Sequence, residues 1–180
     1  MITASQIAGL RTSSIDFDET QRLKAELAQL LVKRDPFFLT AVEFDEILKW
    51  KLRAQYARQQ ARRAANTDEV IRSVTGLALT ISHSDKDYEL ELRVGILCAL
   101  RGVGVPVASA VLALVFPEEY AVIDSRGWRQ VFDQEKTTFS VCDYKRYLDE
   151  IRRLSHQLGW SPQEVDLAIW EYDRRHGSIC

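Results

Sequence analysis

The sequence predicts an all-α protein. Apolar residues recur at helical spacing along most of the chain, and Ser, Thr or Asp stands where several of these runs begin. Only 8 Gly and 4 Pro interrupt the 180 residues, which favours long helices and short connections. The segment 120–123 has strand-like composition but is too short and isolated to build a sheet. We therefore expect one all-helical unit over residues 1–180, with about eight or nine helices.

Caps and breakers delimit the helices of the first half. Leucines on one face mark a helix over 18–33, and Asp35-Pro36 ends it. Thr40–Glu43 has the form of a capping box and starts a second helix, and Thr67 starts a third. A further helix is expected over 87–101, ending before a glycine.

The sequence of the second half predicts further helices, and caps and breakers mark their ends as well. One runs from Val105 to Phe116 and stops before Pro117, and the next begins after Asp124. A long amphipathic helix covers 143–158. The last opens at Ser161–Glu164, where a serine N-cap, a proline at the first helical position and a glutamate form a start signal.

Composition and charge limit the class of protein. The chain is 46% hydrophobic and 28% charged, with a formal net charge of −2, which predicts a globular protein and argues mildly against tight non-specific DNA binding. No signal-peptide pattern is present, and no apolar run approaches the ~20 residues of a membrane span, so we expect a cytoplasmic protein without a membrane partner. We also expect no metal and no cofactor, because the cysteines and histidines stand apart: Cys98, Cys142, Cys180, His83, His156 and His176.

Gly102 and Gly104 predict a tight hairpin between two helices. Few residues are left to reverse the chain, and glycine tolerates positive φ and a close backbone neighbour. Val103 is expected to plug the gap between the helices. The N–H groups at 104–107, of which Pro106 removes one, lack intrahelical acceptors and lie at the positive end of a helix dipole, which suits a phosphate. The alternative is a structural turn that binds nothing.

Residues Leu100 to Phe132 have the sequence "LRGVGVPVASAVLALVFPEEYAVIDSRGWRQVF". This stretch resembles the helix-hairpin-helix base-excision DNA glycosylases. This superfamily includes endonuclease III and the adenine-specific mismatch glycosylase. Its members combine a Gly-Val-Gly hairpin and an apolar helix with an aspartate after a short apolar segment. Here that aspartate is Asp124, and Arg129 stands where the family commonly has an arginine. The hairpin and the aspartate segment together span about 87–132.

The resemblance implies a small, divergent member of this superfamily, with two helical lobes and a cleft between them. It also implies that Asp124 stabilises positive charge on the sugar, or activates water, while the N-glycosidic bond of a flipped base is cleaved. The alternative role for Asp124 is the N-cap of the following helix. The ligands expected for duplex DNA in this stretch are Gly102, Val103, Gly104, Val105, Arg126 and Arg129.

Pro106 departs from the family pattern. Glycosylases that also cleave the strand carry a lysine at this position, whose amine forms a Schiff base with the sugar. The cysteine-rich C-terminal cluster loop of endonuclease III is absent as well. Any activity is therefore expected to be monofunctional, without lyase chemistry at the hairpin.

A second candidate surface is the basic segment 49–63, which no acidic residue interrupts. Basic side chains with aromatic neighbours suit a phosphate backbone and a stacked base. The alternative is a solvated helix face with long, partly covered stems. Lys51 is a candidate ion-pair partner of Asp124 or an alternative catalytic amine. The other expected DNA ligands here are Lys49, Trp50 and Arg53, with Tyr56, Arg58, Arg62 and Arg63 in the same segment.

The sequence leaves three functions open. The first is a monofunctional DNA glycosylase, and the second is a helix-hairpin-helix DNA-binding protein without catalysis. The third is a member of the fold whose pocket serves something other than nucleic acid, or an interaction module. A shared fold does not decide among them. The substrate base, the oligomeric state and the biological process stay open.

Overall fold

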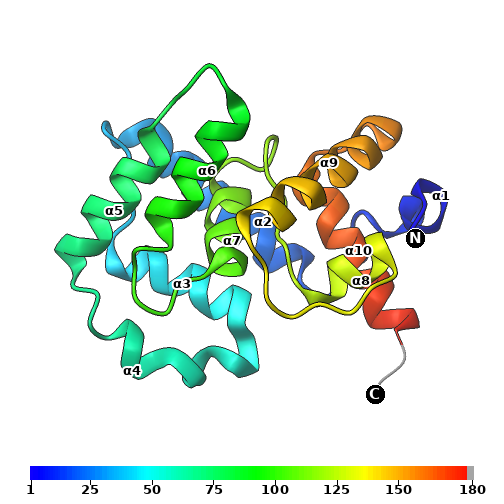
Figure 1. The fold of residues 1–180 in the computed structure, drawn as a ribbon, viewed down its shortest axis with the longest axis horizontal. Coiled ribbons are helices and arrows are strands. Elements are labelled where there is room, and N and C mark those ends of the chain that lie inside the picture. The colour runs from blue at the N-terminus through cyan, green and yellow to red at the C-terminus, as the bar shows by residue number, and fades with distance from the viewer. Residues whose placement is uncertain (178–180) are drawn as a thin grey trace. The chain divides into compact units, whose positions relative to one another are not determined.

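The computed structural model describes residues 1–177 and contains helices but no strand among them (Figure 1). The predicted all-α class is therefore confirmed. The chain divides into two compact units: a central unit, Glu26–Val111, and a terminal unit built from Met1–Ala25 and the chain from Leu112 onward. Cys180, one of the isolated thiols of the sequence, lies outside the described residues.

The elements share short connections and follow one another without a long irregular segment. In chain order, with 3₁₀-helices labelled η, they are α1 (Ala4–Ile7), η1 (Ala8–Leu10), α2 (Phe17–Lys33), α3 (Ala41–Leu52), η2 (Arg53–Gln59), α4 (Gln60–Arg63), α5 (Asp68–Thr80), α6 (Lys86–Leu97), α7 (Val105–Val115), α8 (Ser125–Phe132), α9 (Val141–Leu158) and α10 (Pro162–His176). None of the helices within residues 1–177 has the length and apolar character needed to cross a membrane.

Side-chain caps occur where the sequence predicted helix starts. The Thr40 hydroxyl accepts from the Glu43 amide at 3.3 Å, and the Glu43 carboxylate accepts from the Thr40 amide at 2.7 Å, which closes the capping box of α3. Ser161 and Glu164 form the same reciprocal pair at the start of α10. Thr67 caps α5. The N-termini of these three helices were predicted correctly, because the residues that form each cap lie within four positions of one another.

The helix predicted over 87–101 ends earlier than expected. Helix α6 stops at Leu97, because the amides of Ala99 and Leu100 bond three residues back rather than four. The chain therefore forms a tighter, 3₁₀-type turn at Ala99 and Leu100, just before the hairpin. Helix α9 begins before residue 143, since Ser140 supplies its cap, so Cys142 lies in a helix rather than in a turn.

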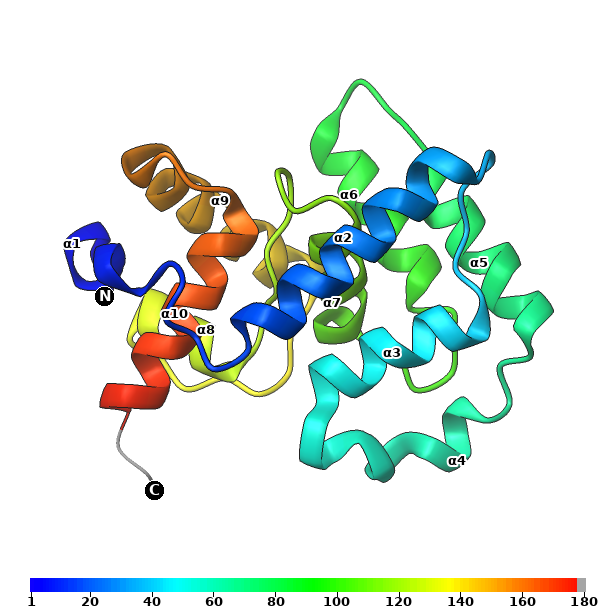
Figure 2. The ribbon, with the colours of Figure 1, turned by 180° about the vertical axis from the view of Figure 1, so that it is seen from behind.

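The central unit is built around α3, α5 and α6, and α5 packs against both of the others. Leu39, Ile47 and Leu97 are fully buried in its core. From α3 the chain runs through η2 and α4 before it enters α5 (Figure 2). The sequence did not predict η2 and α4, because this stretch has no apolar periodicity.

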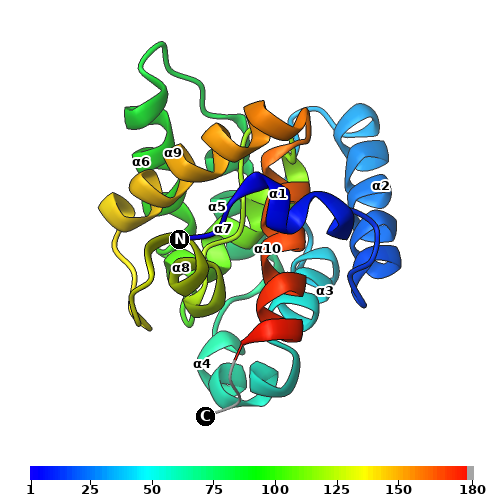
Figure 3. The same ribbon diagram turned by 90° about the vertical axis from the view of Figure 1, so that its right-hand side faces the viewer.

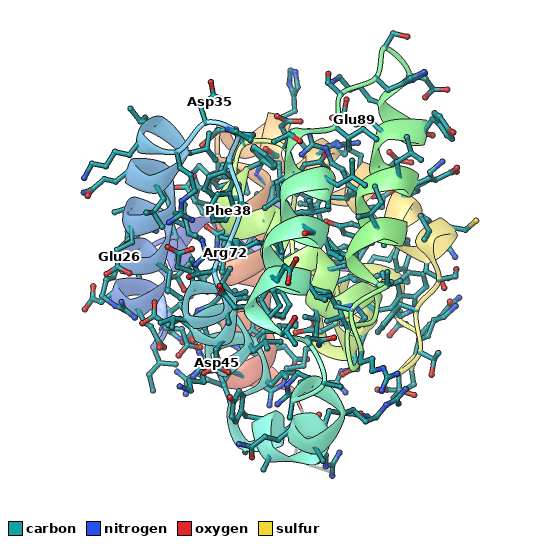
Figure 4. All side chains as sticks on the ribbon, turned by 90° about the vertical axis from the view of Figure 1, so that its left-hand side faces the viewer. Glu26, Asp35, Phe38, Asp45, Arg72 and Glu89 are labelled. Carbon is teal, nitrogen blue, oxygen red and sulfur yellow. The ribbon has the colours of Figure 1, made fainter. Side chains whose placement is uncertain are left out.

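A half-buried aromatic ring of the central unit lies close to two arginines. The Phe38 ring lies 4.5 Å from the Arg34 guanidinium carbon and 5.1 Å from that of Arg72 (Figure 4). Arg34 also pairs with Glu43 at 2.8 Å, so it joins the loop before α3 to the capping box.

The terminal unit is built around α8, α9 and α10, which pack against one another (Figure 3). Trp128, Tyr144 and Tyr147 are its largest fully buried side chains. Ile151 of α9 and Ile169 of α10 are also completely buried. Trp160, Trp170 and Tyr172 are only half-buried.

Candidate nucleic-acid interface and carboxylate site

The hairpin between α6 and α7 forms in the central unit, where the glycines predicted it. Gly102 has φ +76°, a left-handed conformation that favours glycine. The Val103 amide donates to the Leu100 carbonyl at 3.1 Å and closes the turn. Val103 is itself buried, as expected for a side chain that plugs the hairpin.

Two side chains from the segment between α3 and α5 hold the hairpin in place. The Asn66 side chain brackets the backbone of Arg101: its amide donates to the Arg101 carbonyl at 2.9 Å, and its oxygen accepts from the Arg101 amide at 3.0 Å. The stem of Arg63 lies against Gly102, since a Cβ at Gly102 would come 2.8 Å from Arg63 Cγ. The hairpin is therefore pre-organised by contacts within its own unit.

Unpartnered amides remain at the turn. The N–H groups of Gly102, Gly104 and Val105 have no acceptor within residues 1–177, and Pro106 has no N–H to offer. The Gly104 carbonyl accepts from two amides of the first turn of α7, both at 2.9 Å, so the helix starts directly at the hairpin. Free donors at a helix start form a suitable place for a phosphate oxygen.

The residues of the basic segment 49–63 differ in how far they are buried. Trp50 is buried, with 8% exposure, and so belongs to the core rather than to a stacking surface. Lys51 is half-buried in the last turn of α3. Arg53 follows as an exposed residue with φ 46°, an uncommon backbone conformation for a residue with a side chain. Arg58 and Arg62 are exposed.

Lys49 belongs to a polar cluster with Asp45 and Tyr56. The Lys49 ammonium lies 2.7 Å from the Asp45 carboxylate, and the Tyr56 hydroxyl donates to the same carboxylate. Burial raises the pKa of Asp45, but the hydrogen bonds from Lys49 and Tyr56 outweigh it and hold this pKa below the ordinary value. Lys49 is highly exposed, so its charge is screened by solvent.

Asp124, in the terminal unit, caps α8. Its Oδ1 accepts from the Gly127 amide at 2.9 Å, and its backbone carbonyl accepts from the Trp128 amide at 2.9 Å. The side chain is half-buried. The predicted N-cap role is therefore confirmed, and it leaves the carboxylate fixed in orientation by the helix start.

A buried tyrosine and a second carboxylate lie next to this cap. The Tyr147 hydroxyl donates to Asp166 Oδ1 at 2.9 Å, and it occupies the space into which a side chain at Gly127 would point. Burial, followed by the charges of Asp166 and Asp124, raises the pKa of Tyr147 well above its ordinary value. Tyr147 therefore stays a neutral donor beside the Asp124 cap.

Both arginines expected to contact DNA after Asp124 lie close to a buried carboxylate. Arg129 Nη2 donates to the two Asp173 oxygens at 2.8 and 3.0 Å, and Arg129 also pairs with Glu135 at 3.0 Å. The hydrogen bonds that Arg129 donates to Asp173 and then to Glu135 raise its pKa. Arg126 lies 3.8 Å from Asp173, and its guanidinium carbon is 5.2 Å from the centre of the Trp170 ring.

The predicted site residues therefore fall into two groups. Gly102 to Val105, Lys49, Trp50, Lys51 and Arg53 belong to the central unit, whereas Asp124, Arg126 and Arg129 belong to the terminal unit. Sequence reasoning did not find the roles of Asn66, Tyr147 and Asp173. Only contacts between residues far apart in the chain identify these three, and no local motif signals them.

No family model, curated protein or solved structure matches this chain at a significant level.

Proposed function

We propose that this chain is a helix-hairpin-helix DNA-binding protein of the base-excision glycosylase type, in which the hairpin holds a backbone phosphate. The resemblance around Gly102 and Asp124 suggests this function, and the geometry of each unit supports it. The same proposal includes two helical lobes with a cleft between them, as in that superfamily. The partner is duplex DNA, bound mainly through its phosphates.

The hairpin is the observation that carries the proposal. Three unpartnered amides, on Gly102, Gly104 and Val105, gather at one turn beside the start of α7. Asn66 and Arg63 fix that turn from the same unit, so little ordering is needed when a phosphate oxygen binds. Gly104, in the middle of the three, is exposed.

Asp124 is the proposed catalytic carboxylate. Cleavage of an N-glycosidic bond builds positive charge on the sugar, which a fixed carboxylate stabilises, or the same group activates water. Asp124 Oδ1 is held by the Gly127 amide, so the carboxylate is oriented without help from the substrate. Pro106 excludes a Schiff base at the hairpin position where strand-cleaving relatives carry lysine.

A second candidate is a DNA-binding protein of the same fold without catalysis. The N-cap role alone accounts for an aspartate at position 124, because aspartate is among the preferred residues at the start of a helix. The pairing of Arg129 with Asp173 and Glu135 likewise serves the stability of the terminal unit. Both candidates share DNA binding by the hairpin and differ only in the chemistry of Asp124.

Equilibrium binding to a fluorescent DNA duplex across a salt series tests the shared part. The expected result is measurable affinity at low salt that falls steeply as salt rises, because phosphate contacts release counterions. Absence of binding to duplex, mismatched and abasic DNA at low salt would contradict the proposal.

A base-release assay separates the two candidates. The substrates are duplexes that carry uracil, alkylated purines, 8-oxoguanine or mismatched adenine. The glycosylase predicts release from at least one of them, with a loss of orders of magnitude in Asp124→Asn while DNA binding is kept. Equal release by both proteins would move the chemistry away from Asp124 and make Lys51 the next candidate. No release from any duplex would favour the DNA-binding protein without catalysis.

A further inference from the structure

Arg63 is a buried cation whose direct contacts are a backbone carbonyl and an aromatic ring. Only 7% of this residue is exposed, and its guanidinium forms no ion pair within residues 1–177. Its Nη1 is buried and has no hydrogen-bond acceptor in the same part of the chain. Arg93, which is exposed to the same 7%, shows the usual arrangement, because it pairs with the buried Glu89 at 3.1 Å.

Asp45 is near enough that the charge of Arg63 helps to lower its pKa, but no direct ion pair joins the two side chains among the described residues. Its Nη2 donates to the Tyr56 carbonyl, and its guanidinium carbon lies 4.8 Å from the centre of the Tyr56 ring. The carboxylate of Asp45 already accepts from Lys49 and Tyr56. A buried charge without a counter-ion is costly, so proteins normally pair such groups or use them to bind a ligand.

Arg63 lines a cavity in the central unit with a volume of about 540 Å³. This volume lies within the range of small-molecule sites. The apolar wall consists of the buried Phe44, Leu48 and Ile71, and Lys49 lines the same cavity. Asp45, on α3, marks this region in Figure 4. The cavity therefore combines an apolar surface with two cationic side chains, Arg63 and Lys49, and with the carboxylates of Asp45 and Glu46, of which Asp45 pairs with Lys49.

We propose that this cavity, named here the Arg63 pocket, binds a small organic oxyanion. The ligand carries a phosphate or carboxylate group that pairs with Arg63 and Lys49, and an apolar body that lies on Phe44, Leu48 and Ile71. A phosphate or carboxylate supplies the acceptor that Arg63 Nη1 lacks and a direct ion pair for the buried guanidinium. The proposal does not depend on the function proposed above.

A purely structural role for Arg63 makes a different prediction. Its stem supports Gly102, and this support requires only an unbranched aliphatic chain of similar length. Arg63→Met keeps such a chain and removes the charge. The matched control is Arg62→Met, the same change at the adjacent, exposed arginine of α4.

Binding of phenyl phosphate and benzoate, followed by NMR at constant ionic strength, tests the site. The signals of Ala41, Ala64 and Ile71, which line the pocket, should shift with either anion but not with benzylamine. Phenyl phosphate should also raise the melting temperature of the wild type, because it binds the folded state. In Arg63→Met the dissociation constant should rise at least about tenfold, while Arg62→Met responds like the wild type.

Three results would overturn the proposal: no shift of the pocket signals with either anion, equal shifts with benzylamine, or an unchanged response in Arg63→Met. If Arg63→Met does not fold, Ala64→Trp replaces it. Ala64 is exposed and lines the pocket, so the indole should fill the cavity and remove the response. Binding that persists in this variant would also overturn the proposal.

Addition of unlabelled duplex DNA identifies the source of the oxyanion. If the duplex displaces phenyl phosphate from the wild type, the pocket binds a backbone phosphate of DNA. If the pocket signals respond equally with and without the duplex, the ligand is a separate small molecule. Both results support an oxyanion site at Arg63, and the second holds even if the chain does not bind DNA.

Discussion

Tyr147 occupies the space beside Gly127 that a side chain at that position would need. A Cβ built on Gly127 would overlap the Tyr147 hydroxyl oxygen, and this hydroxyl is held at 2.9 Å by Asp166. The amide of the same Gly127 donates to Asp124 at 2.9 Å. The buried tyrosine, the glycine and the capping aspartate therefore form one packed arrangement.

The first prediction concerns this packing. Alanine is a better helix former than glycine by about 1 kcal/mol, but overpacking a fixed buried group costs about 1–3 kcal/mol. Gly127→Ala should therefore lower the free energy of unfolding, measured by urea denaturation. In a Tyr147→Phe background the same change should cost less, because the overlapping atom is gone. An equal cost in both backgrounds would contradict the arrangement.

The second prediction compares the two hairpin glycines. Gly102 has φ +76° and the Arg63 stem beside it, whereas a Cβ at Gly104 would meet only Pro106 Cδ at 3.9 Å. Gly102→Ala should cost about 1–2 kcal/mol more than Gly104→Ala, because an L-residue is strained in the left-handed region. Urea denaturation of both variants measures the difference. Equal stabilities would show that the hairpin adopts another turn in solution.

The third prediction concerns the Asp124 cap. Asn keeps a side-chain oxygen for the Gly127 amide, so Asp124→Asn should change the free energy of unfolding by less than about 1 kcal/mol. Asp124→Ala removes the acceptor and should cost about 0.5–2 kcal/mol. Thermal or urea unfolding gives both values. If Asp124→Ala is as stable as Asp124→Asn, the cap does not stabilise α8.

The fourth prediction concerns acid stability. Glu171 is fully buried, and hydrogen bonds from Arg174 and then Arg175 lower its pKa from 4.5 to about 2, although burial acts in the opposite direction. Because the folded-state pKa is the lower one, its stabilising effect is fully present above pH about 4.5 and is lost as pH falls towards about 2.

Urea unfolding of the wild type and Glu171→Gln across this pH range measures the effect. The stability difference between them should shrink as pH falls, and added salt should reduce it, because both arginines are partly exposed. Glu69→Gln, at an exposed glutamate in the first turn of α5, is the control and should show no such trend. A difference that is constant with pH would contradict the assigned pairing.

Local signals made much of the fold predictable from the sequence. The capping boxes at Thr40 and Ser161, the cap at Asp124 and the turn at Gly102 each depend on residues a few positions apart. The hydrogen bonds of a helix cap form between neighbouring residues once the helix itself forms, so the sequence pattern of a cap predicts them. The end of α6 was missed, because tightening of its last turn depends on the following hairpin.

The site was less predictable, because its partners come from distant parts of the chain. Arg63 was expected to lie on a solvated basic surface, and its burial against Gly102 follows from the path of η2 and α4, which lack a periodic pattern. The hydrogen bond from Tyr147 to Asp166 depends on the packing of α9 on α10. The types of two residues far apart in the sequence do not show whether their side chains will meet in the fold.

The affinity of one hairpin variant for duplex DNA tests the central claim most directly. Gly104→Glu places a carboxylate beside the unpartnered amides, where only Pro106 Cδ lies within 4 Å of the new Cβ. Gly95→Glu makes the same change on the exposed face of α6, where a Cβ meets nothing within 4 Å. Both variants should fold, and both alter the net charge equally.

The measurement is the dissociation constant of a fluorescent duplex at low salt for the wild type and the two variants. The account predicts that Gly104→Glu weakens binding at least about tenfold, because the new carboxylate repels a phosphate at the hairpin, while Gly95→Glu stays within about twofold of the wild type. Equal affinities of Gly104→Glu and Gly95→Glu would contradict DNA binding by the hairpin.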